Sequence, residues 1–309
     1  MTPVVARAPA KVNFVLHVGP RRADGFHEIA TVYQAVDLYD EVVAESRRDG
    51  VVSVETRDDG GKPVAGVHDD DRHLSVRAVF ALWSRLGVRD GVHLRVRKHI
   101  PVAGGLAGGS ADAAAALVAC NRLWGLDAHV SVLAELAAGL GSDVPFALFG
   151  GTAVGTGRGE RLVPVAVAGR ISWVVVTSQR GLSTADVYAE TDRPAGDVAP
   201  PVVDPALPAA LERGDTAATA WLLHNDLQPA AVRLRPTLAA ILDVGRDAGA
   251  VAALLSGSGP SALLLVPDGG PAEALAAAVR PRVLQLDADA AVRVARGPVA
   301  GAAVVDEIR

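Results

Sequence analysis

The stretch "IPVAGGLAGGSADAAAALVACN", from Ile100 to Asn121, decides how the rest of the chain is interpreted. The sixteen residues from Pro101 to Ala116 hold four glycines and seven alanines. Such small residues leave backbone N–H groups uncovered, and the start of a helix adds a partial positive charge to them. The stretch therefore predicts a loop that binds an anion, above all phosphate, and that leads into a helix from about residue 110 to 124.

Two familiar phosphate motifs do not match this stretch. A P-loop needs a lysine directly after its last glycine, but Ser110 follows Gly109 here. The spacing of the glycines also differs from the dinucleotide-binding fingerprint, and the protein-kinase motifs are absent from the sequence. Because glycine loops are common, a tight strand-to-helix turn in an alanine-rich core explains the stretch equally well on its own.

The composition is that of an ordinary globular protein without an obvious macromolecular partner. The 309 residues are 50% apolar and 21% charged, and the net charge of −5 does not favour nucleic acid. We find no leader-like segment and no uncharged apolar run long enough for a bilayer, so no membrane partner is expected. The single cysteine, Cys120, allows no internal disulfide and fits a reducing compartment. We therefore expect a cytoplasmic protein.

Periodicity predicts mixed helix and strand in two α+β halves that meet near residues 160–170, with a ligand cleft between them. A proline-rich loop or linker is expected at 191–208. Strands are expected at 4–18, 30–36, 40–46, 51–56, 91–100, 151–155 and 172–177, and as a strand–turn–strand at 250–266. Further helices are expected at 74–87, after 131, and at 209–223, 238–248 and 271–283.

Three other stretches carry residues suited to chemistry. "RAPAKVNFVLHV" places Lys11 and Asn13 at the start of a strand, and "GLGSDVPFALFGG" places Asp143 at a change of chain direction, since Pro145 restrains the residue before it. "LLSGSGPSALLL" is a second glycine turn. Taken alone, Lys11 fits an exposed strand end and Asp143 fits a turn. Together with the loop after Ile100, in this order along the chain, they resemble the motifs of the GHMP small-molecule kinases.

The resemblance implies an α+β, two-domain GHMP kinase fold. Its N-terminal half, residues 1–165, would be ribosomal-protein-S5-domain-2-like and carry the glycine loop; its C-terminal half, 166–309, would be ferredoxin-like. The implied cofactors are ATP and Mg²⁺. Asp143 would accept the proton of the attacking hydroxyl, and Lys11 would keep Asp143 ionised. The expected ATP-binding residues are Pro101, Val102, Ala103, Gly104, Gly105, Leu106, Ala107, Gly108, Gly109, Ser110 and Ala111.

Two longer stretches, "PAKVNFVLHVGPRRADGFHEI" and "GSDVPFALFGGTAVGTGRGE", resemble one branch of this family. The resemblance implies a cytidine diphosphate-linked methylerythritol as small-molecule substrate, phosphorylated at its 2-hydroxyl in the non-mevalonate route to isoprenoid precursors. His27 would then bind the cytosine edge, with Phe26 and Tyr188 on its two faces. Ordinary core packing explains Tyr188 about equally well. Asn13 and Thr184 complete the expected substrate-binding set, and a monomer or weak homodimer is expected.

The sequence departs from the family pattern at several positions, among them Phe26, where many relatives have tyrosine. Ala103 and Ala107 stand at glycine positions; each adds only a methyl group, so phosphate binding should survive. His73 stands where asparagine is expected near the adenine. Gly109 is expected to need a positive φ. The segment "HDDDRH" at 68–73 could hold a metal, but its polar setting favours a solvated acidic loop, and no metal ligand is assigned.

Three alternatives remain open at this point. The chain could be a GHMP kinase for another alcohol, a silent binding protein with this fold, or a nucleotide-binding protein that uses the glycine loop alone. "RADGFH" argues against the first alternative, and the presence of both Lys11 and Asp143 argues against the second. Binding of ATP without turnover would favour the third.

Overall fold

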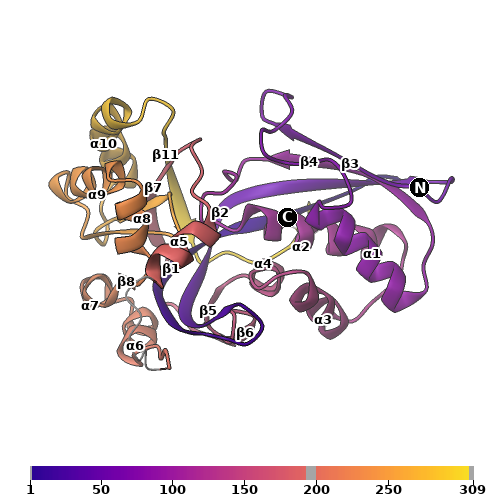
Figure 1. Ribbon diagram of the computed structural model, residues 1–309, viewed down its shortest axis with the longest axis horizontal. Helices are drawn as coiled ribbons and strands as arrows, with labels where there is room; N and C mark the ends of the chain where they lie inside the picture. The colour runs from indigo at the N-terminus through magenta and orange to yellow at the C-terminus, as the bar shows by residue number, and fades with distance from the viewer. Residues whose placement is uncertain (1, 193–199, 306–309) are drawn as a thin grey trace.

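The structure is a computed structural model that describes residues 2–192 and 200–305. Two sheets organise it (Figure 1): a mixed sheet of eight strands, formed mostly by the N-terminal half, and an antiparallel sheet of four strands in the C-terminal half. The long strands β1 (Val4–Arg21) and β2 (His27–Arg47) run from the first half towards the second. The predicted α+β class with two halves is confirmed by this arrangement.

The other elements follow in chain order. The strands are β3 (Val52–Asp58), β4 (Gly91–Lys98), β5 (Thr152–Thr156), β6 (Arg161–Pro164), β7 (Ile171–Thr177), β8 (His224–Asn225), β9 (Ala252–Leu255), β10 (Ala262–Leu265), β11 (Ala291–Gly297) and β12 (Ala303–Val304). The helices are α1 (Leu74–Leu86), α2 (Gly108–Leu123), α3 (Val130–Leu140), α4 (Val144–Phe149), α5 (Thr184–Thr191), α6 (Ala206–Arg213), α7 (Thr216–Leu222), α8 (Gln228–Leu234), α9 (Thr237–Asp247) and α10 (Ala272–Leu286).

The larger sheet is built on the hairpin of β1 and β2. Its main order is β12–β1–β2–β4–β3, while β5 extends β2 and β8 pairs with β1 in parallel. The sequence predicted two strands, 30–36 and 40–46, where the structure has one continuous β2. Its pairing with β1 shifts register between Pro9 and Ala10, so a β-bulge absorbs the irregularity that had suggested a break.

Helix α2 occupies the centre of the N-terminal half. It packs against β1, β2, α1, α3 and α4, and its alanines from Ala113 to Ala116 are fully buried. Alanine side chains are small enough for such close approach on several sides of a helix. Cys120 is also fully buried on α2, as expected for a packing residue, and burial raises the pKa of its thiol.

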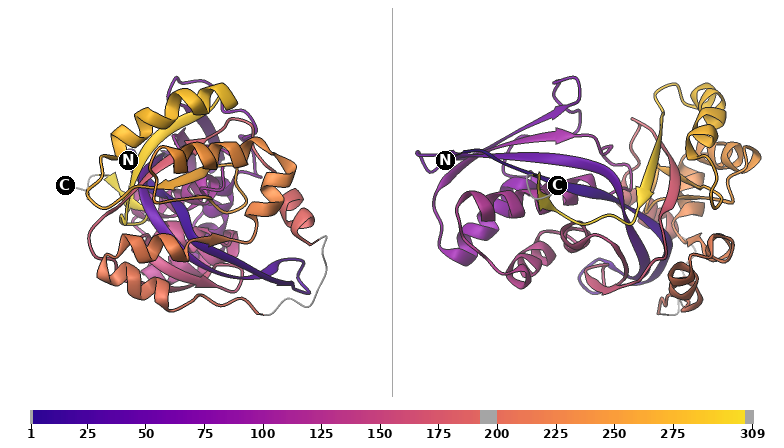
Figure 2. Two further views of the ribbon diagram at one scale, coloured as in Figure 1. Left: turned by 90° about the vertical axis from the view of Figure 1, so that its left-hand side faces the viewer. Right: turned by 180° about the vertical axis from the view of Figure 1, so that it is seen from behind.

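The smaller sheet has the order β11–β7–β10–β9 with all neighbours antiparallel. This is the strand order of a ferredoxin-like β-α-β-β-α-β unit, as the resemblance implied. Helices α9 and α10 lie on the outer side of this sheet, as Figure 2 (left) shows. The helix predicted at 209–223 is in fact two helices, because Gly214 adopts a left-handed φ of 68° and ends α6.

The C-terminal half is not a separate unit in space, because β8 and β12 both join the larger sheet. Side chains also connect the two sheets. Trp173 of β7 is fully buried, lies 5.3 Å from Phe14 between ring centres, and donates a hydrogen bond of 3.2 Å to Gln34 Oε1. The proposed boundary between residues 165 and 166 thus falls in a loop between β6 and β7, and it stays a prediction.

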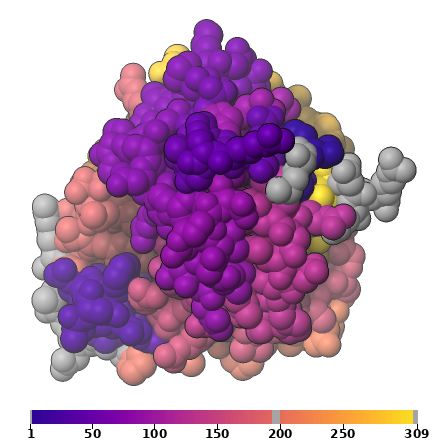
Figure 3. All heavy atoms as spheres, turned by 90° about the vertical axis from the view of Figure 1, so that its right-hand side faces the viewer, coloured from indigo at the N-terminus to yellow at the C-terminus, as the bar shows by residue number. Residues whose placement is uncertain are grey.

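From its N-terminal end the molecule shows mainly the first half of the chain (Figure 3). Atoms of residues near 50–100 cover most of this face, and the tip of the β1–β2 hairpin lies at its lower left. Among the described residues, no helix is long and apolar enough to span a bilayer.

Candidate active site

The predicted site residues surround one cavity of about 840 Å³ at the junction of the two halves. The glycine loop, β1 and the start of α4 line it from the first half; α5 and the turn after β9 line it from the second. A pocket of this size, between two structural units, suits a small molecule. The predicted residues at its wall are Lys11, Asn13, Phe26, His27, Asp143, Thr184, Tyr188, Pro101, Val102, Ala103, Gly104, Gly105, Ala107, Gly108 and Gly109.

Three residues of the predicted loop do not reach the wall of this cavity: Leu106, Ser110 and Ala111. Leu106 is buried, and its carbonyl oxygen accepts a hydrogen bond of 3.1 Å from the Lys11 N–H. The backbone of Leu106 therefore ties the loop to β1, while its side chain packs in the core. Helix α2 begins at Gly108, two residues earlier than predicted.

The loop backbone is left-handed at unexpected places. Ala103, Gly105 and Ala107 have φ values of 51°, 75° and 59°, whereas Gly109 does not have the predicted positive φ. A β-carbon at Gly109 would meet only Leu74 Cδ1 at 3.6 Å, which is an ordinary contact. The steric constraint lies at Gly105, where a β-carbon would be 2.1 Å from the carbonyl oxygen of Ser256. Ala103 and Ala107 carry a conformation that costs L-residues about 1–2 kcal/mol.

The glycine loop and the C-terminal glycine turn pack directly on each other. The Gly105 carbonyl accepts hydrogen bonds from Lys11 Nζ at 2.8 Å and from Ser256 Oγ at 3.0 Å. Asn225 of β8 holds the turn by donating to the carbonyls of Leu255 and Gly257, both at 2.8 Å. Loop, turn and Lys11 thus form one hydrogen-bonded unit.

Lys11 is buried beside the cavity, where its ammonium donates to Asn13 Oδ1 at 2.8 Å. Asn13 in turn donates to Thr31 Oγ1 at 2.8 Å. Burial lowers the pKa of Lys11, and the opposing attraction of the Asp143 charge raises it by less. Asn13 is therefore placed to orient Lys11, in addition to its expected contact with substrate.

Asp143 is the residue that caps the start of α4, yet its side chain makes no capping hydrogen bond. Asp143 lines the cavity, as does Tyr33, a residue that the sequence did not single out. Burial raises the pKa of Tyr33 well above its usual value, and the Asp143 charge raises it further. Pro145 at the start of α4 fits the predicted change of direction.

The other end of the cavity is aromatic. Phe26 is 51% exposed, with the Arg158 guanidinium 5.1 Å above its ring centre. His27 stacks on Tyr188 with ring centres 4.9 Å apart, and His27 Nε2 lies 3.0 Å from Asp192 Oδ1. An ionised carboxylate accepts only, so Nε2 carries the proton.

One face of Tyr188 thus already contacts His27, which differs from the simple two-sided stack that the sequence suggested. Thr184 connects this end of the cavity to the C-terminal glycine turn. Its hydroxyl lies 3.0 Å from Ser258 Oγ, within hydrogen-bond distance.

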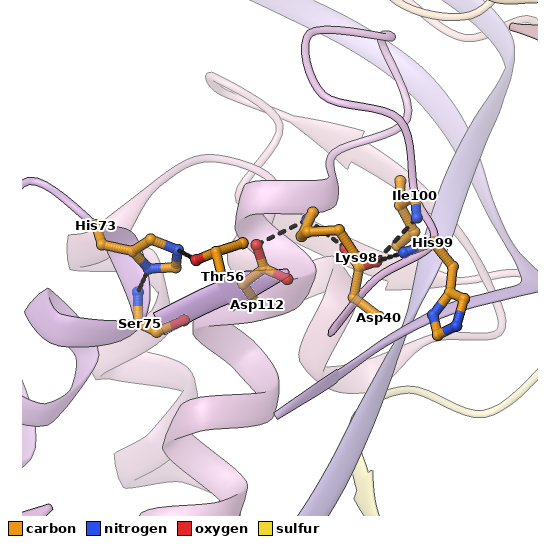
Figure 4. Close-up of polar contacts among 8 residues, drawn as sticks. All are labelled: Asp40, Thr56, His73, Ser75, Lys98, His99, Ile100 and Asp112. Carbon is orange, nitrogen blue, oxygen red and sulfur yellow. Dashed lines mark hydrogen bonds and ion pairs between the residues drawn. The ribbon is translucent and has the colours of Figure 1, made fainter. Parts of the chain in front are cut away.

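His73 caps helix α1 and also lines the cavity, while its expected place near the adenine stays a prediction. Its Nδ1 accepts from the Ser75 N–H at 3.1 Å, and its Nε2 lies 3.3 Å from Thr56 Oγ1 (Figure 4). Because Nδ1 accepts, the ring is neutral with the proton on Nε2. Burial, and then the positive charge of Lys98, lower the pKa of His73.

A buried ionic group lies where β4 enters the glycine loop (Figure 4). Lys98 donates to Asp40 and, at 2.7 Å, to Asp112 Oδ2 of α2. Asp40 Oδ1 also accepts from the N–H groups of His99 and Ile100, at 2.6 and 2.8 Å. Burial lowers the pKa of Lys98, but the charges of Asp112 and Asp40 outweigh it and the net shift is upward. The second oxygen, Asp112 Oδ1, is buried without a hydrogen-bond partner among the described residues.

The sequence analysis missed several residues at the cavity. The scarcity of lysine was a signal for Lys98, since only three lysines occur in 309 residues. Asp112 and Tyr33 carried no signal of their own, because an acidic residue on a helix and a tyrosine in a strand are ordinary. Other residues at the wall that were not predicted are Arg21, Arg72, Arg158, Asp192, Gly257 and Ser258.

The segment 68–73 behaves largely as the predicted polar loop. Asp70 is exposed and paired with Arg72 at 2.5 Å, and Asp69 Oδ2 accepts from the Thr56 N–H at 3.2 Å. In the described ranges, the histidine and carboxylate groups close enough to share a metal are instead His17, His224 and Asp226, on and beside β1 and β8. Asp226 already accepts from the Val18 N–H at 2.8 Å and lies 2.6 Å from His224 Nε2.

Comparison with known sequences identifies relatives over almost the whole chain. The family description "GHMP kinases N terminal domain" matches residues 73–151, and "GHMP kinases C terminal" matches residues 206–284. A Streptomyces coelicolor protein named 4-diphosphocytidyl-2-C-methyl-D-erythritol kinase is 50% identical over 98% of this chain and 99% of its own length. A Kineococcus radiotolerans protein with the same name is 52% identical over 90% of this chain and 86% of its own length.

Solved structures with the same fold span nearly the whole chain as well. A crystal structure of 4-(cytidine 5'-diphospho)-2C-methyl-D-erythritol kinase superposes with a TM-score of 0.72 at 31% identity, covering 96% of this chain and 100% of that one. Homoserine kinase from Cytophaga hutchinsonii superposes with a TM-score of 0.77 at 20% identity, covering 99% and 98% of the two chains. The second similarity shows the fold alone.

Proposed function

The chain belongs to the GHMP kinase family, and from this premise we propose that it transfers the γ-phosphoryl group of ATP to the 2-hydroxyl of 4-diphosphocytidyl-2-C-methyl-D-erythritol. Relatives with the name of that kinase, at about half identity over nearly the full length, support the substrate. The step belongs to the non-mevalonate route to isoprenoid precursors. The observation that carries the proposal is the convergence of Lys11, Asp143 and the glycine loop on one cavity, with His27 and Tyr188 at its aromatic end.

The glycine loop and the start of α2 are proposed to hold the ATP phosphates. Backbone N–H groups at a helix start, together with the helix dipole, favour an anion there. The packing of Gly105 against Ser256 fixes the loop before the nucleotide arrives. Phosphoryl transfer passes through a loose transition state, so such fixed positioning supplies much of the catalysis.

Asp143 is proposed to accept the proton of the substrate 2-hydroxyl. Its carboxylate makes no capping hydrogen bond to α4, and Asp143 lines the cavity. Lys11, held by Asn13 and the Gly105 carbonyl, would offset negative charge on the phosphoryl group in transit. Burial of Lys11 strengthens this interaction because it lowers the local dielectric.

Mg²⁺ is proposed to accompany ATP, and when bound it supplies neutralisation of the phosphate charge. The residues at the loop fit such an ion, because the buried carboxylate oxygen Asp112 Oδ1 has no hydrogen-bond partner in the described structure. Mg²⁺ prefers oxygen ligands and usually takes only one or two from protein carboxylates.

The cytidine end is proposed to lie between the β1–β2 hairpin and α5. His27 Nε2 lies against Asp192, which leaves Nδ1 as the ring nitrogen available to an N–H on the cytosine edge. Phe26, half exposed beside Arg158, offers a free ring face for stacking.

The decisive experiment measures ADP release by the purified protein with and without 4-diphosphocytidyl-2-C-methyl-D-erythritol. We expect release that depends on this substrate and is far slower with homoserine, mevalonate or galactose. Release with one of those alcohols instead would assign the chain to another GHMP kinase activity. ATP binding without any turnover would favour a nucleotide-binding protein. The expected cytoplasmic location and the monomer or weak homodimer remain predictions, the latter for light scattering to test.

A further inference from the structure

We propose that Asp112 is the protein ligand of the divalent cation that arrives with the nucleotide, through its oxygen Oδ1. The inference rests on the proposed function, since it assumes that the glycine loop holds nucleotide phosphates. Asp112 lies near the start of α2, four residues after Gly108. Like Gly108 and Gly109, it lines the cavity. It was not among the residues that the sequence suggested.

The first observation is the unequal use of the two carboxylate oxygens. Oδ2 accepts from Lys98 Nζ at 2.7 Å, while Oδ1 has no partner among the described residues (Figure 4). The side chain is only 3% exposed, so bulk water does not satisfy Oδ1. A buried acceptor left unpaired is costly, which implies that its partner comes with the ligand.

The second observation is the charge of the ionic group. Lys98 brings one positive charge, and Asp40 and Asp112 bring two carboxylates, all of them buried. With Lys98 paired to both carboxylates, the group has no net positive charge to offer the phosphates of a bare nucleotide. A divalent cation between Asp112 and the phosphates supplies that charge, so the site should prefer the metal–nucleotide complex.

The third observation is that Asp112 is held rigidly. Lys98 fixes its Oδ2, and Lys98 itself is fixed by Asp40, which is anchored by the N–H groups of His99 and Ile100. Lys98 thus acts as the positioning residue that orients the ligand carboxylate, a common arrangement around metal ligands. Asp40 does not line the cavity, which makes it the natural comparison.

The test uses Mn²⁺ as a paramagnetic probe together with a non-hydrolysable ATP analogue, adenylyl imidodiphosphate. Free Mn²⁺ is counted by electron paramagnetic resonance while it is titrated into the analogue alone or into the enzyme–analogue complex. The enzyme complex is expected to bind Mn²⁺ about tenfold or more tightly than the free analogue does. Equal affinities would mean that the protein contributes no ligand, and would overturn the proposal without any variant.

The variant Asp112→Asn keeps the size of the side chain and an acceptor for Lys98. We expect it to lose the gain in Mn²⁺ affinity while its binding of the metal-free analogue is unchanged or tighter. The comparison variant Asp40→Asn alters the same ionic group but keeps an oxygen that can accept from the N–H groups of His99 and Ile100, so Lys98 and Asp112 should stay in place and most of the gain should remain. Equal loss in both variants would show a general charge effect and would overturn the assignment to Asp112.

These outcomes are separate from the fate of the proposed function. If the wild-type protein does not bind the analogue at all, with or without metal, the proposed kinase function fails first. If it binds the analogue and turns over, but Asp112→Asn holds Mn²⁺ like wild type, only the ligand assignment is wrong. Circular dichroism of both variants shows whether the comparison is made between folded proteins.

Discussion

A substitution at Asp143 is expected to lower the rate of phosphoryl transfer without changing the affinity for ATP. In Asp143→Asn the side chain keeps its shape but can no longer accept the hydroxyl proton as a carboxylate does. We expect kcat to fall by about 10²–10⁴-fold, with ATP affinity nearly unchanged. Steady-state ADP release and nucleotide titration measure the two effects. A variant that keeps more than about a tenth of the wild-type kcat would contradict the role as proton acceptor.

His27 tests the choice of substrate. Replacement by alanine removes the hydrogen bond proposed for cytosine and also the ring that stacks on Tyr188. An unpaired cytosine group should cost roughly 1–3 kcal/mol, which raises KM for the cytidine substrate by about tenfold or more. KM for ATP should change little, which separates the effect from misfolding.

Competition by free CMP provides the control for His27. CMP should compete with the substrate in the wild type, and less well in His27→Ala. If the substrate KM did not change in the variant, the kinase assignment would stand but the cytidine contact at His27 would be withdrawn.

His73 should make stability depend on pH in a defined direction. Its folded-state pKa is lowered, so as pH falls the unfolded chain takes up the proton first. The stabilisation from the His73 cap is fully present above the pKa of histidine in the unfolded chain, about 6.5, and it decreases as the pH falls below that value. Its loss costs about 1 kcal/mol.

Urea unfolding at pH 7.5 and 5.5 measures this effect, with His73→Asn as the comparison. Asparagine also caps helices but does not titrate. The wild type should lose more unfolding free energy on acidification than the variant does. An equal loss in both proteins would show that the His73 cap does not carry the dependence.

At the scale of elements, the glycine loop depends on Gly105 more than on Gly109. In Gly105→Ala the new methyl group would lie 2.1 Å from the Ser256 carbonyl in a left-handed backbone, so loop or turn must shift. We expect a loss of more than about 2 kcal/mol in unfolding free energy, together with weaker ATP binding. Gly109→Ala is the matched control and should lose little stability, because its new methyl group would lie at an ordinary contact distance of 3.6 Å from Leu74 Cδ1. Similar losses in both variants would contradict the packing described for Gly105.

Element prediction worked where one local pattern decides the outcome. Helix α1 was predicted within one residue, because a cap at His73 and Gly87 with a φ of 72° mark its ends. The short helices α5 and α8 and the strands β11 and β12 were not predicted, because tertiary packing and not periodicity stabilises them. In the site, motif residues such as Lys11 and Asp143 were found, whereas Asp112 and Tyr33 gain meaning only from neighbours distant in sequence.

At the scale of the whole molecule, Trp173 connects the two sheets. In Trp173→Ala the contact with Phe14 and the hydrogen bond to Gln34 are lost from a fully buried site. We expect a loss of about 3–5 kcal/mol in unfolding free energy, measured by denaturant titration. Trp221→Ala is the control, since Trp221 is 90% exposed and should change stability by about 0.5 kcal/mol or less. A small effect at Trp173 would mean that the two halves unfold independently.

The buried thiol of Cys120 on α2 provides a chemical probe for the opening of that helix. Cys120 is inaccessible in the folded state, and burial raises the pKa of its thiol, so an alkylating reagent can reach it only when α2 opens. The rate of alkylation therefore reports how often α2, at the centre of the N-terminal half, opens. The glycine loop leads directly into α2, so a ligand that stabilises the loop should lower the alkylation rate of Cys120. The decrease would measure how much the ligand suppresses the opening of α2, which a steady-state assay does not detect.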